Sequence, residues 1–143
     1  PDPDELYTDV YVPSTVTQAE IETERKLRQQ VRSDPDMRTI PYAQALQEAM
    51  REEMERDERV FIFGEDVGLY GGAYGATRGL WEEFGEWRVI DTPISEATVG
   101  GAAVGAAMAG TRPVAEIMDV DFTPLAMDQS ATQGAKNRSM CGG

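Results

Sequence analysis

DTPISEATVGGAAVGAAMAG, residues 91–110, shows most clearly how strand and helix patterns alternate in this chain. It begins as a short extended segment, passes one acidic side chain at Glu96, and then consists almost wholly of glycine and alanine. Ser95 is of a residue type that caps helix N-termini, so a helix is predicted over about 96–110. The stretch therefore sets one carboxylate at the start of a helix that has almost no side chains.

The segments around this stretch alternate between helix and strand patterns. Short apolar runs predict three buried strands, at 60–64, within 88–94 and at 112–118. Apolar periodicity and capping residues predict helices at about 18–31, 42–57, 96–110 and 122–137, with a helical turn at 79–84. This alternation is typical of an α/β fold with a mainly parallel sheet. Three strands are few for an open sheet, so we expect the fold to continue beyond residue 143.

Composition excludes several classes of function. The 143 residues carry a net charge of −13, so we expect no nucleic-acid partner, because binding phosphates requires a basic patch. The chain has no histidine, which leaves carboxylates, cofactor atoms or another chain for acid–base chemistry. The single cysteine, Cys141, excludes an internal disulfide and favours a reducing, cytoplasmic location. No uncharged run approaches the roughly 20 residues of a membrane helix, so no membrane partner is expected.

The glycine and alanine residues of the predicted 96–110 helix gather on one side. Gly101, Gly105 and Ala109 have four-residue spacing and share a face that another backbone can approach closely. Glu96 has two interpretations. A first-turn acid stabilises its helix through the helix dipole, by roughly 0.3–1 kcal/mol. A carboxylate that follows a strand also lies where open α/β sheets bind ligands.

A second acidic pair follows the first predicted strand. In GEDVG at 64–68, Glu65 and Asp66 come directly after the strand and a glycine. Two strand ends therefore bring acids to the same edge of the sheet, where such acids can bind a metal, relay a proton or solvate a loop. The glycine-rich run GLYGGAYG at 68–75 matches neither GxGxxG nor GxxxxGK[ST], which favours a flexible loop over a phosphate site.

Several motifs together resemble one protein family. They are GEDVGLYGGAYGATRGLWEEFG, RVIDTPISEATVGGAAVGAAMAGTRPVAEIMDVDF, and then DQ and GAKNR. In this order they resemble the beta subunit of the thiamine-diphosphate-dependent 2-oxo acid dehydrogenases, which include the pyruvate, branched-chain and acetoin enzymes. The resemblance implies the pyrimidine-binding domain of transketolase-like enzymes, a parallel sheet flanked by helices, here truncated. It implies the decarboxylating component of a heterotetrameric enzyme.

The resemblance also implies roles for individual residues. The glutamate of the family's DTPISE motif falls on Glu96, where it hydrogen-bonds the aminopyrimidine ring of thiamine diphosphate. The resulting imino tautomer generates the ylide, which decarboxylates a 2-oxo acid before the acyl group passes to lipoamide. Family cofactor contacts also fall on Glu65, Met118 and Phe122, the last two as an apolar wall. A polar contact of the pyruvate enzymes falls on Leu125, so the choice of 2-oxo acid stays open.

The implied partners follow from the same family. An alpha-type subunit or domain holds the diphosphate and its Mg²⁺ through a GDG…N motif, so no metal ligand is expected on this chain. A second beta copy and a lipoyl-bearing acyltransferase complete the assembly. The first residues, PDPDELYTDVY, resemble the C-terminal tail of a bacterial alpha subunit. We therefore expect a fused alpha tail at 1–12, a linker with a helix at 13–38, and the N-terminal part of the domain at 39–143.

Other functions stay open beside this one. The run DQSATQGAKNRSMCGG departs from the family, since Ser139 stands where tyrosine is common and Cys141 follows it closely. These departures motivate an alternative, a catalytically inactive fragment that acts as a subunit-interaction module. A nucleotide-binding regulatory domain is disfavoured because the chain has no phosphate-binding loop.

Overall fold

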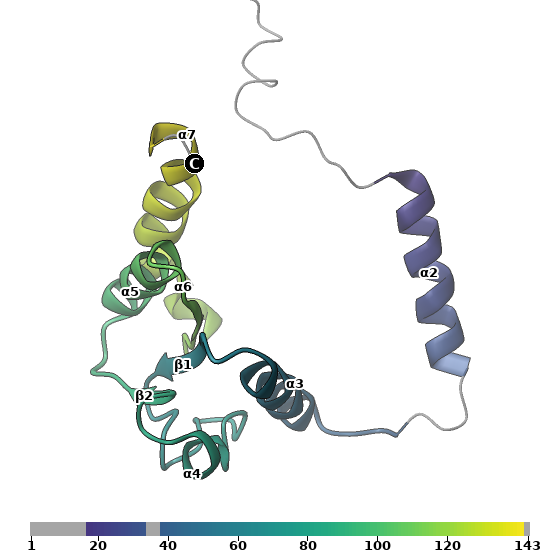
Figure 1. Cartoon of the computed structure of the whole chain (residues 1–143), viewed down its shortest axis with the longest axis horizontal. Helices are drawn as coiled ribbons and strands as arrows, with labels where there is room; N and C mark the ends of the chain where they lie inside the picture. Colours follow the sequence, from purple (N-terminus) through teal and green to yellow (C-terminus); the bar gives the residue numbers. More distant parts are fainter. Residues whose placement is uncertain (1–16, 34–37, 142–143) are drawn as a thin grey trace, which may run out of the picture. The chain divides into compact units, whose positions relative to one another are not determined.

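The structure, a computed structural model, describes residues 17–33 and 38–141 (Figure 1). The chain forms two compact units, Pro1–Thr39 and Ile40–Gly143. The expected alpha-type tail at 1–12 and the start of the expected linker lie outside the described residues.

The described part of the first unit is one polar helix, α2 (Gln18–Ser33). A capping box starts it: the Thr17 amide donates to Glu20 Oε2 at 2.6 Å, and the Glu20 amide donates to Thr17 Oγ1 at 3.3 Å. The predicted helix start is therefore confirmed. Leu27 is 58% exposed, as expected of a helix with few apolar positions.

The second unit is built on a three-stranded parallel sheet. Its strands β1 (Val60–Gly64), β2 (Val89–Asp91) and β3 (Arg112–Ala115) lie in the order β2-β1-β3. Ile62 is paired with Val89 on one side and with Val114 on the other. The parallel sheet is confirmed, and β1 is its central strand, which agrees with the continuous apolar run in its sequence.

Helices pack on both faces of the sheet (Figure 1). The helices α3 (Tyr42–Arg56) and α4 (Leu80–Phe84) lie on the face where Val60 and Ile62 are buried. Core side chains on that face are Met54, Val60, Ile62, Val67, Leu80 and Val89. The alternate β1 residues, Phe61 and Phe63, stack with ring centroids 5.5 Å apart, and Phe63 lies by α5 (Glu96–Met108) on the other face.

The C-terminal helical region differs from the single helix predicted over about 122–137. It runs through η1 (Val120–Phe122), α6 (Thr123–Met127), the π-helical η2 (Asp128–Gly134) and α7 (Ala135–Cys141). Packing against α5 gives the reason. Gln129 lies against Gly101, and Gly134 lies against Val104. Residues five apart fall on different faces of an α-helix, so the wider π turn lets both contact α5.

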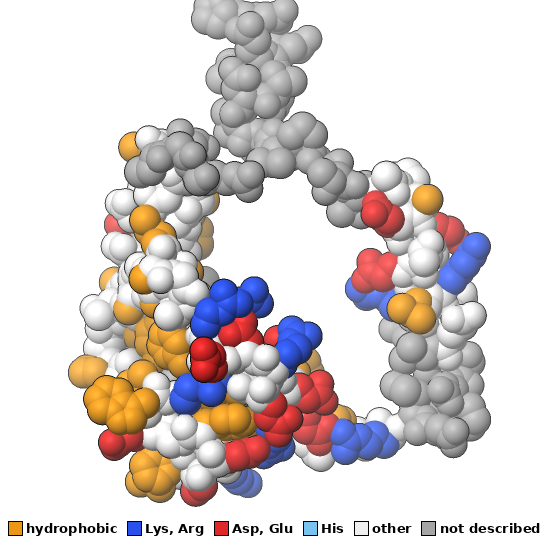
Figure 2. Space-filling view, viewed as in Figure 1, with side chains coloured by type: hydrophobic (Ala, Val, Ile, Leu, Met, Phe, Trp, Pro, Cys, Tyr) orange, Lys and Arg blue, Asp and Glu red, His pale blue; other side chains and the backbone are white. Residues whose placement is uncertain are grey.

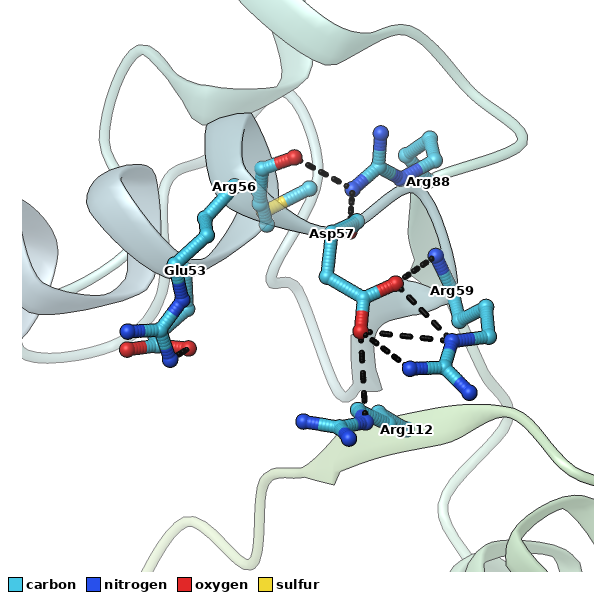
Figure 3. Close-up of polar contacts among 7 residues, drawn as sticks. Glu53, Arg56, Asp57, Arg59, Arg88 and Arg112 are labelled. Carbon is cyan, nitrogen blue, oxygen red and sulfur yellow. Dashed lines mark hydrogen bonds and ion pairs between the residues drawn. The ribbon is translucent and has the colours of Figure 1, made fainter.

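The starts of the three strands are joined by arginine side chains (Figure 3). Arg59 donates to both carboxylate oxygens of Asp57 at 2.8–3.2 Å, and Arg112 forms an ion pair with the same carboxylate at 3.2 Å. The hydrogen bonds from Arg59 hold the pKa of Asp57 well below its usual range. Arg88 donates to the backbone carbonyls of Val60, Met54 and Asp57 at 2.7, 2.9 and 3.1 Å. This edge of the sheet is therefore closed by paired charges.

The surface of the second unit divides by side-chain type. Figure 2 shows Lys, Arg, Asp and Glu side chains gathered around α3, while hydrophobic side chains are exposed elsewhere on the unit. Within residues 17–33 and 38–141, each helix is too short or too polar to cross a lipid bilayer.

Candidate functional site

The carboxyl ends of the three strands lie side by side, at the opposite end of the strands from the arginine network. This carboxyl-terminal side of the sheet is called its edge below. Gly64 pairs with Asp91, and the Glu116 amide donates to the Phe63 carbonyl at 2.9 Å. Glu65 and Glu116 therefore follow directly on neighbouring strands, and Asp91 ends the third. Ligands of open α/β sheets bind outside the carboxyl ends of the strands, which makes this edge the candidate site.

Hydrogen bonds hold the glycine-rich loop after β1 against the carboxyl ends of the strands. Asp66 has a φ of 54°, and its backbone carbonyl accepts a hydrogen bond from the Gly72 amide at 2.8 Å. The Gly68 amide donates to Asp91 Oδ1 at 2.7 Å, and buried Thr77 donates to the Val67 carbonyl at 2.7 Å. These bonds give the loop a defined conformation, which its composition alone did not predict.

Glycine is required where this loop meets β2. A Cβ added to Gly68 would lie 2.6 Å from Asp91 Oδ2. Only a residue without a side chain lets the backbone amide reach the Asp91 carboxylate, so the glycine serves this contact rather than a phosphate.

The two predicted glutamates occupy different elements at this edge. Glu65 follows β1 directly, and Glu96 is the first residue of α5; both are partly buried. Ser95 caps α5 as predicted, since its side chain accepts a hydrogen bond from the Thr98 amide at 3.4 Å. Among the described residues, neither glutamate makes a hydrogen bond or an ion pair, so both carboxylates are available to a ligand.

The two predicted apolar contacts lie on the segment after β3. Met118 is partly buried, and Phe122 ends η1 with 41% of its surface exposed. Glu65 follows β1, which is the neighbour of β3 in the sheet, so its backbone lies beside the start of this segment. Glu96 lies on a separate element, α5. No hydrogen bond or ion pair among the described residues joins Glu96 to Glu65.

An apolar pocket of about 270 Å³ opens beside the start of α5. Its lining residues are Phe63, Thr92, Pro93, Ser95, Thr98, Val99 and Ala102. The Thr92 hydroxyl is buried and has no hydrogen-bond partner among the residues that the structure describes. A buried hydroxyl without a partner is costly, so this group is suited to a polar atom of a ligand or of another chain.

Glu116 was missed by the sequence analysis. Burial raises the pKa of its carboxyl, and Glu65, Asp119 and Asp66 raise it further. Its Oε2 is buried and finds no hydrogen-bond partner within residues 17–33 and 38–141. The strand predicted at 112–118 placed Glu116 inside a strand, whereas β3 ends at Ala115 and Glu116 follows it.

A tyrosine links the glycine-rich loop to the segment after β3. Tyr74 donates from its hydroxyl to Asp119 Oδ1 at 2.6 Å, and this bond raises the pKa of Tyr74. The edge therefore combines free carboxylates, an apolar pocket and exposed apolar side chains. This combination can contact both apolar and polar atoms of a ligand. Among the described residues no group of acidic or cysteine side chains is arranged to hold a metal ion.

Comparison with known proteins agrees with this geometry. The family described as "Transketolase, pyrimidine binding domain" matches residues 38–142. The chain is 48% identical over 112 residues to the bovine (Bos taurus) mitochondrial pyruvate dehydrogenase E1 component subunit beta, covering 78% of this chain and 31% of that protein. It is 51% identical over 102 residues to 2-oxoisovalerate dehydrogenase subunit beta of Bacillus subtilis, covering 71% of this chain and 31% of that protein.

A further relative is the pyruvate dehydrogenase E1 component subunit beta of Rickettsia bellii, 52% identical over 104 residues, with 73% of this chain and 32% of that protein covered. The chain thus spans about a third of the length of these curated relatives. The resemblance to beta subunits of 2-oxo acid dehydrogenases is confirmed, and by its sheet, its strand-end acids and its match over residues 38–142 the chain belongs to the transketolase pyrimidine-binding domain family.

Proposed function

We propose that this chain supplies the pyrimidine side of a thiamine-diphosphate site in the decarboxylating component of a 2-oxo acid dehydrogenase. One observation carries the proposal. Glu96, the first residue of α5, is partly buried, directly follows Ser95 of the apolar pocket, and makes no hydrogen bond or ion pair with another described residue. The relatives support the class of enzyme, since they are E1 beta and 2-oxoisovalerate dehydrogenase beta subunits.

In this function the chain's own residues bind and orient a ring. Glu96 hydrogen-bonds a ring nitrogen and holds the proton at that atom. Met118 and Phe122 provide an apolar wall that excludes water, and Glu65 adds a second carboxylate at the edge. The bound cofactor supplies the electron sink for decarboxylation of a 2-oxo acid and for acyl transfer to lipoamide.

The rest of the reaction depends on other chains. An alpha-type subunit or domain holds the diphosphate and Mg²⁺, a second beta copy completes the assembly, and a lipoyl-bearing acyltransferase accepts the acyl group. The cytoplasmic location stays a prediction, and the printed name of the bovine relative places that protein in mitochondria.

Replacement of Glu96 tests the proposal. In the full-length protein with its alpha-type partner, Glu96→Gln should lower kcat for decarboxylation by about 10²–10⁴, the range for loss of a positioned acid–base group. Glu82→Gln, which removes an exposed carboxylate from α4, is the matched control and should leave kcat unchanged. Equal rates for Glu96→Gln and Glu82→Gln would contradict the proposed role.

The alternative, a catalytically inactive interaction module, has one observation in its favour. Apolar side chains of η1 and α6 are exposed, with Val120 at 83%, Leu125 at 56% and Met127 at 50%. Such a surface suits another subunit. Under this alternative Leu125→Asp weakens assembly with the alpha-type partner, while Glu96→Gln changes neither assembly nor any rate.

A further inference from the structure

The proposed function gives no role to the glycine-rich loop at 68–75, although hydrogen bonds fix its shape. The Gly72 amide donates to the Asp66 carbonyl at 2.8 Å, which ties the loop to the end of β1. The Gly75 amide donates to the Gly72 carbonyl at 3.0 Å and closes a four-residue turn. Tyr74 is the third residue of that turn, so its backbone is held on both sides while its side chain stays 66% exposed.

The Tyr74 side chain joins this turn to the segment that follows β3. Its hydroxyl donates to Asp119 Oδ1 at 2.6 Å, although 45 residues separate the two in the chain. Within residues 17–33 and 38–141, it is the only hydrogen bond between the glycine-rich loop and the segment after β3. The loop, which starts at the end of β1, therefore reaches the segment that leaves the neighbouring strand.

Asp119 makes an unusual use of its side chain. It is the N-cap residue of η1, where an aspartate commonly accepts a hydrogen bond from an amide of its own helix. Its carboxylate makes no such bond and accepts from Tyr74 instead. Its backbone carbonyl accepts from the Phe122 amide at 3.0 Å, and Met118 directly precedes it. The position of Asp119 therefore determines where both Met118 and Phe122 leave the backbone.

The segment that carries these two side chains has little stability of its own. η1 is only three residues long, and so short a helix does not persist without contacts from elsewhere in the fold. Phe122 is 41% exposed, so burial holds it only in part. A bond from a fixed turn to the N-cap residue is thus well placed to order the segment.

We propose that Tyr74 is a positioning residue, which acts through Asp119 to hold Met118 and Phe122 in place as an apolar wall. The glycine-rich loop then serves as a brace between the end of β1 and the segment after β3. What the wall contacts rests on the proposed function, but the effect of the Tyr74 hydroxyl on this segment does not. Tyr74 itself touches neither the cofactor nor the reacting atoms in this scheme.

Hydrogen exchange of the full-length protein, followed by mass spectrometry without cofactor, tests the brace. Tyr74→Phe removes one oxygen atom and should speed amide exchange in residues 116–123 roughly 2- to 10-fold, the range for loss of one hydrogen bond. Tyr70→Phe is the matched control, because Tyr70 lies in the same loop, is 69% exposed and makes no hydrogen bond from its hydroxyl to a described residue. It should exchange as the wild type does.

Two substitutions of Asp119 test the acceptor. Asp119→Asn keeps a side-chain oxygen that can accept from Tyr74, so it should keep most of the protection of residues 116–123. Asp119→Ala removes the acceptor and should exchange as fast as Tyr74→Phe. Should Tyr74→Phe fail to fold, these two variants still decide, since both retain Tyr74.

Two exchange results would overturn the brace. If residues 116–123 exchange equally in Tyr74→Phe, Tyr70→Phe and the wild type, the Tyr74 hydroxyl does not hold the segment. If Asp119→Ala exchanges as slowly as Asp119→Asn, the Asp119 side chain is not the acceptor that orders it.

Thiamine diphosphate with Mg²⁺ then tests the positioning role, with the full-length protein and its alpha-type partner. Tyr74→Phe should raise the KM for thiamine diphosphate roughly 2- to 10-fold and leave kcat at saturating cofactor nearly unchanged, because the wall contacts the cofactor throughout the reaction. Tyr70→Phe should keep the wild-type KM. Faster exchange in Tyr74→Phe with an unchanged KM would contradict the positioning role. A wild type that does not bind thiamine diphosphate would instead refute the proposed function, and faster exchange in Tyr74→Phe would still establish the brace.

Discussion

The two ends of the strands in this small sheet differ in whether their charged side chains are paired. At the start of the strands, Asp57 forms ion pairs with Arg59 and Arg112. Arg88 donates hydrogen bonds to three backbone carbonyls there. At the carboxyl end, Glu65 and Glu96 have no partner among the described residues, and Glu116 has a buried oxygen without a donor. Complete pairing stabilises the first edge, while the second keeps polar groups free for a ligand at a cost in stability.

The largest loss of stability is expected from removing an arginine side chain at the start of the strands. Arg88→Ala removes the donor of three hydrogen bonds to the carbonyls of Met54, Asp57 and Val60. We expect a loss of roughly 2–3 kcal/mol in the free energy of unfolding, measured by urea denaturation. Arg56→Ala, which removes an exposed ion pair with Glu53, is the control and should cost no more than about 0.5 kcal/mol. Similar losses for the two variants would show that the Arg88 hydrogen bonds stabilise the fold no more than an exposed ion pair does.

A smaller loss of stability is expected from a substitution at the carboxyl ends of the strands. Gly64→Ala introduces a Cβ 2.7 Å from Glu116 Cβ and 3.0 Å from the Glu116 carbonyl oxygen, so β3 must shift. We expect a loss of roughly 1–3 kcal/mol in thermal or urea unfolding. Gly105→Ala is the matched glycine, because an added Cβ there meets no atom within 4 Å, and replacement inside α5 should stabilise by roughly 0.5–1 kcal/mol. A neutral Gly64→Ala would mean that Glu116 is not held against the strand.

The pH dependence of the closed edge comes next. The pKa of Asp57 is lowered in the folded protein, so its contribution to stability is fully present above the pKa of about 3.9 of an unfolded aspartate. The contribution is lost as the pH falls further, because the carboxylate must then be protonated. Asp57→Asn should therefore be less stable than the wild type at neutral pH, with the difference in melting temperature shrinking below about pH 3.9. A difference that does not change with pH would contradict this.

The smallest effect, of opposite sign, is expected from Glu116→Gln. A raised pKa in the folded state means that ionised Glu116 destabilises the protein as the pH rises above the ordinary glutamate value of 4.5. Glu116→Gln should therefore raise the melting temperature slightly at neutral pH and have no effect below pH 4.5. A gain that persists in acid would show that the substitution acts through packing rather than through charge.

Much of the fold could be predicted from local sequence. The run VFIFG, the Ser95 cap and the capping box of Thr17 and Glu20 each predicted an element that the structure contains. These signals are local, because a strand's burial pattern and a helix cap depend on neighbouring residues. The π-helical η2 was not predicted, since it results from the register between α5 and the C-terminal helices.

The candidate site was predicted in part for the same reason. Glu65 and Glu96 were identified because each follows a predicted strand, and the DTPISE motif singles out Glu96. Glu116 follows a strand as well, but its interest lies in a buried oxygen without a partner. That property depends on Gly64 of another strand, more than 50 residues away, and no local pattern contains it.

Local sequence patterns were enough to predict the three strands, the helices before residue 120 and the acids that follow the first two strands. They also determined the family, through motifs that remain together in order over residues 38–142. The strand order β2-β1-β3, the ion pairs of Asp57 and the buried Glu116 oxygen without a partner among the described residues all depend on tertiary packing. The reason is physical: pairing, burial and the charge state of a carboxyl depend on groups that are distant in the chain and meet only when it folds.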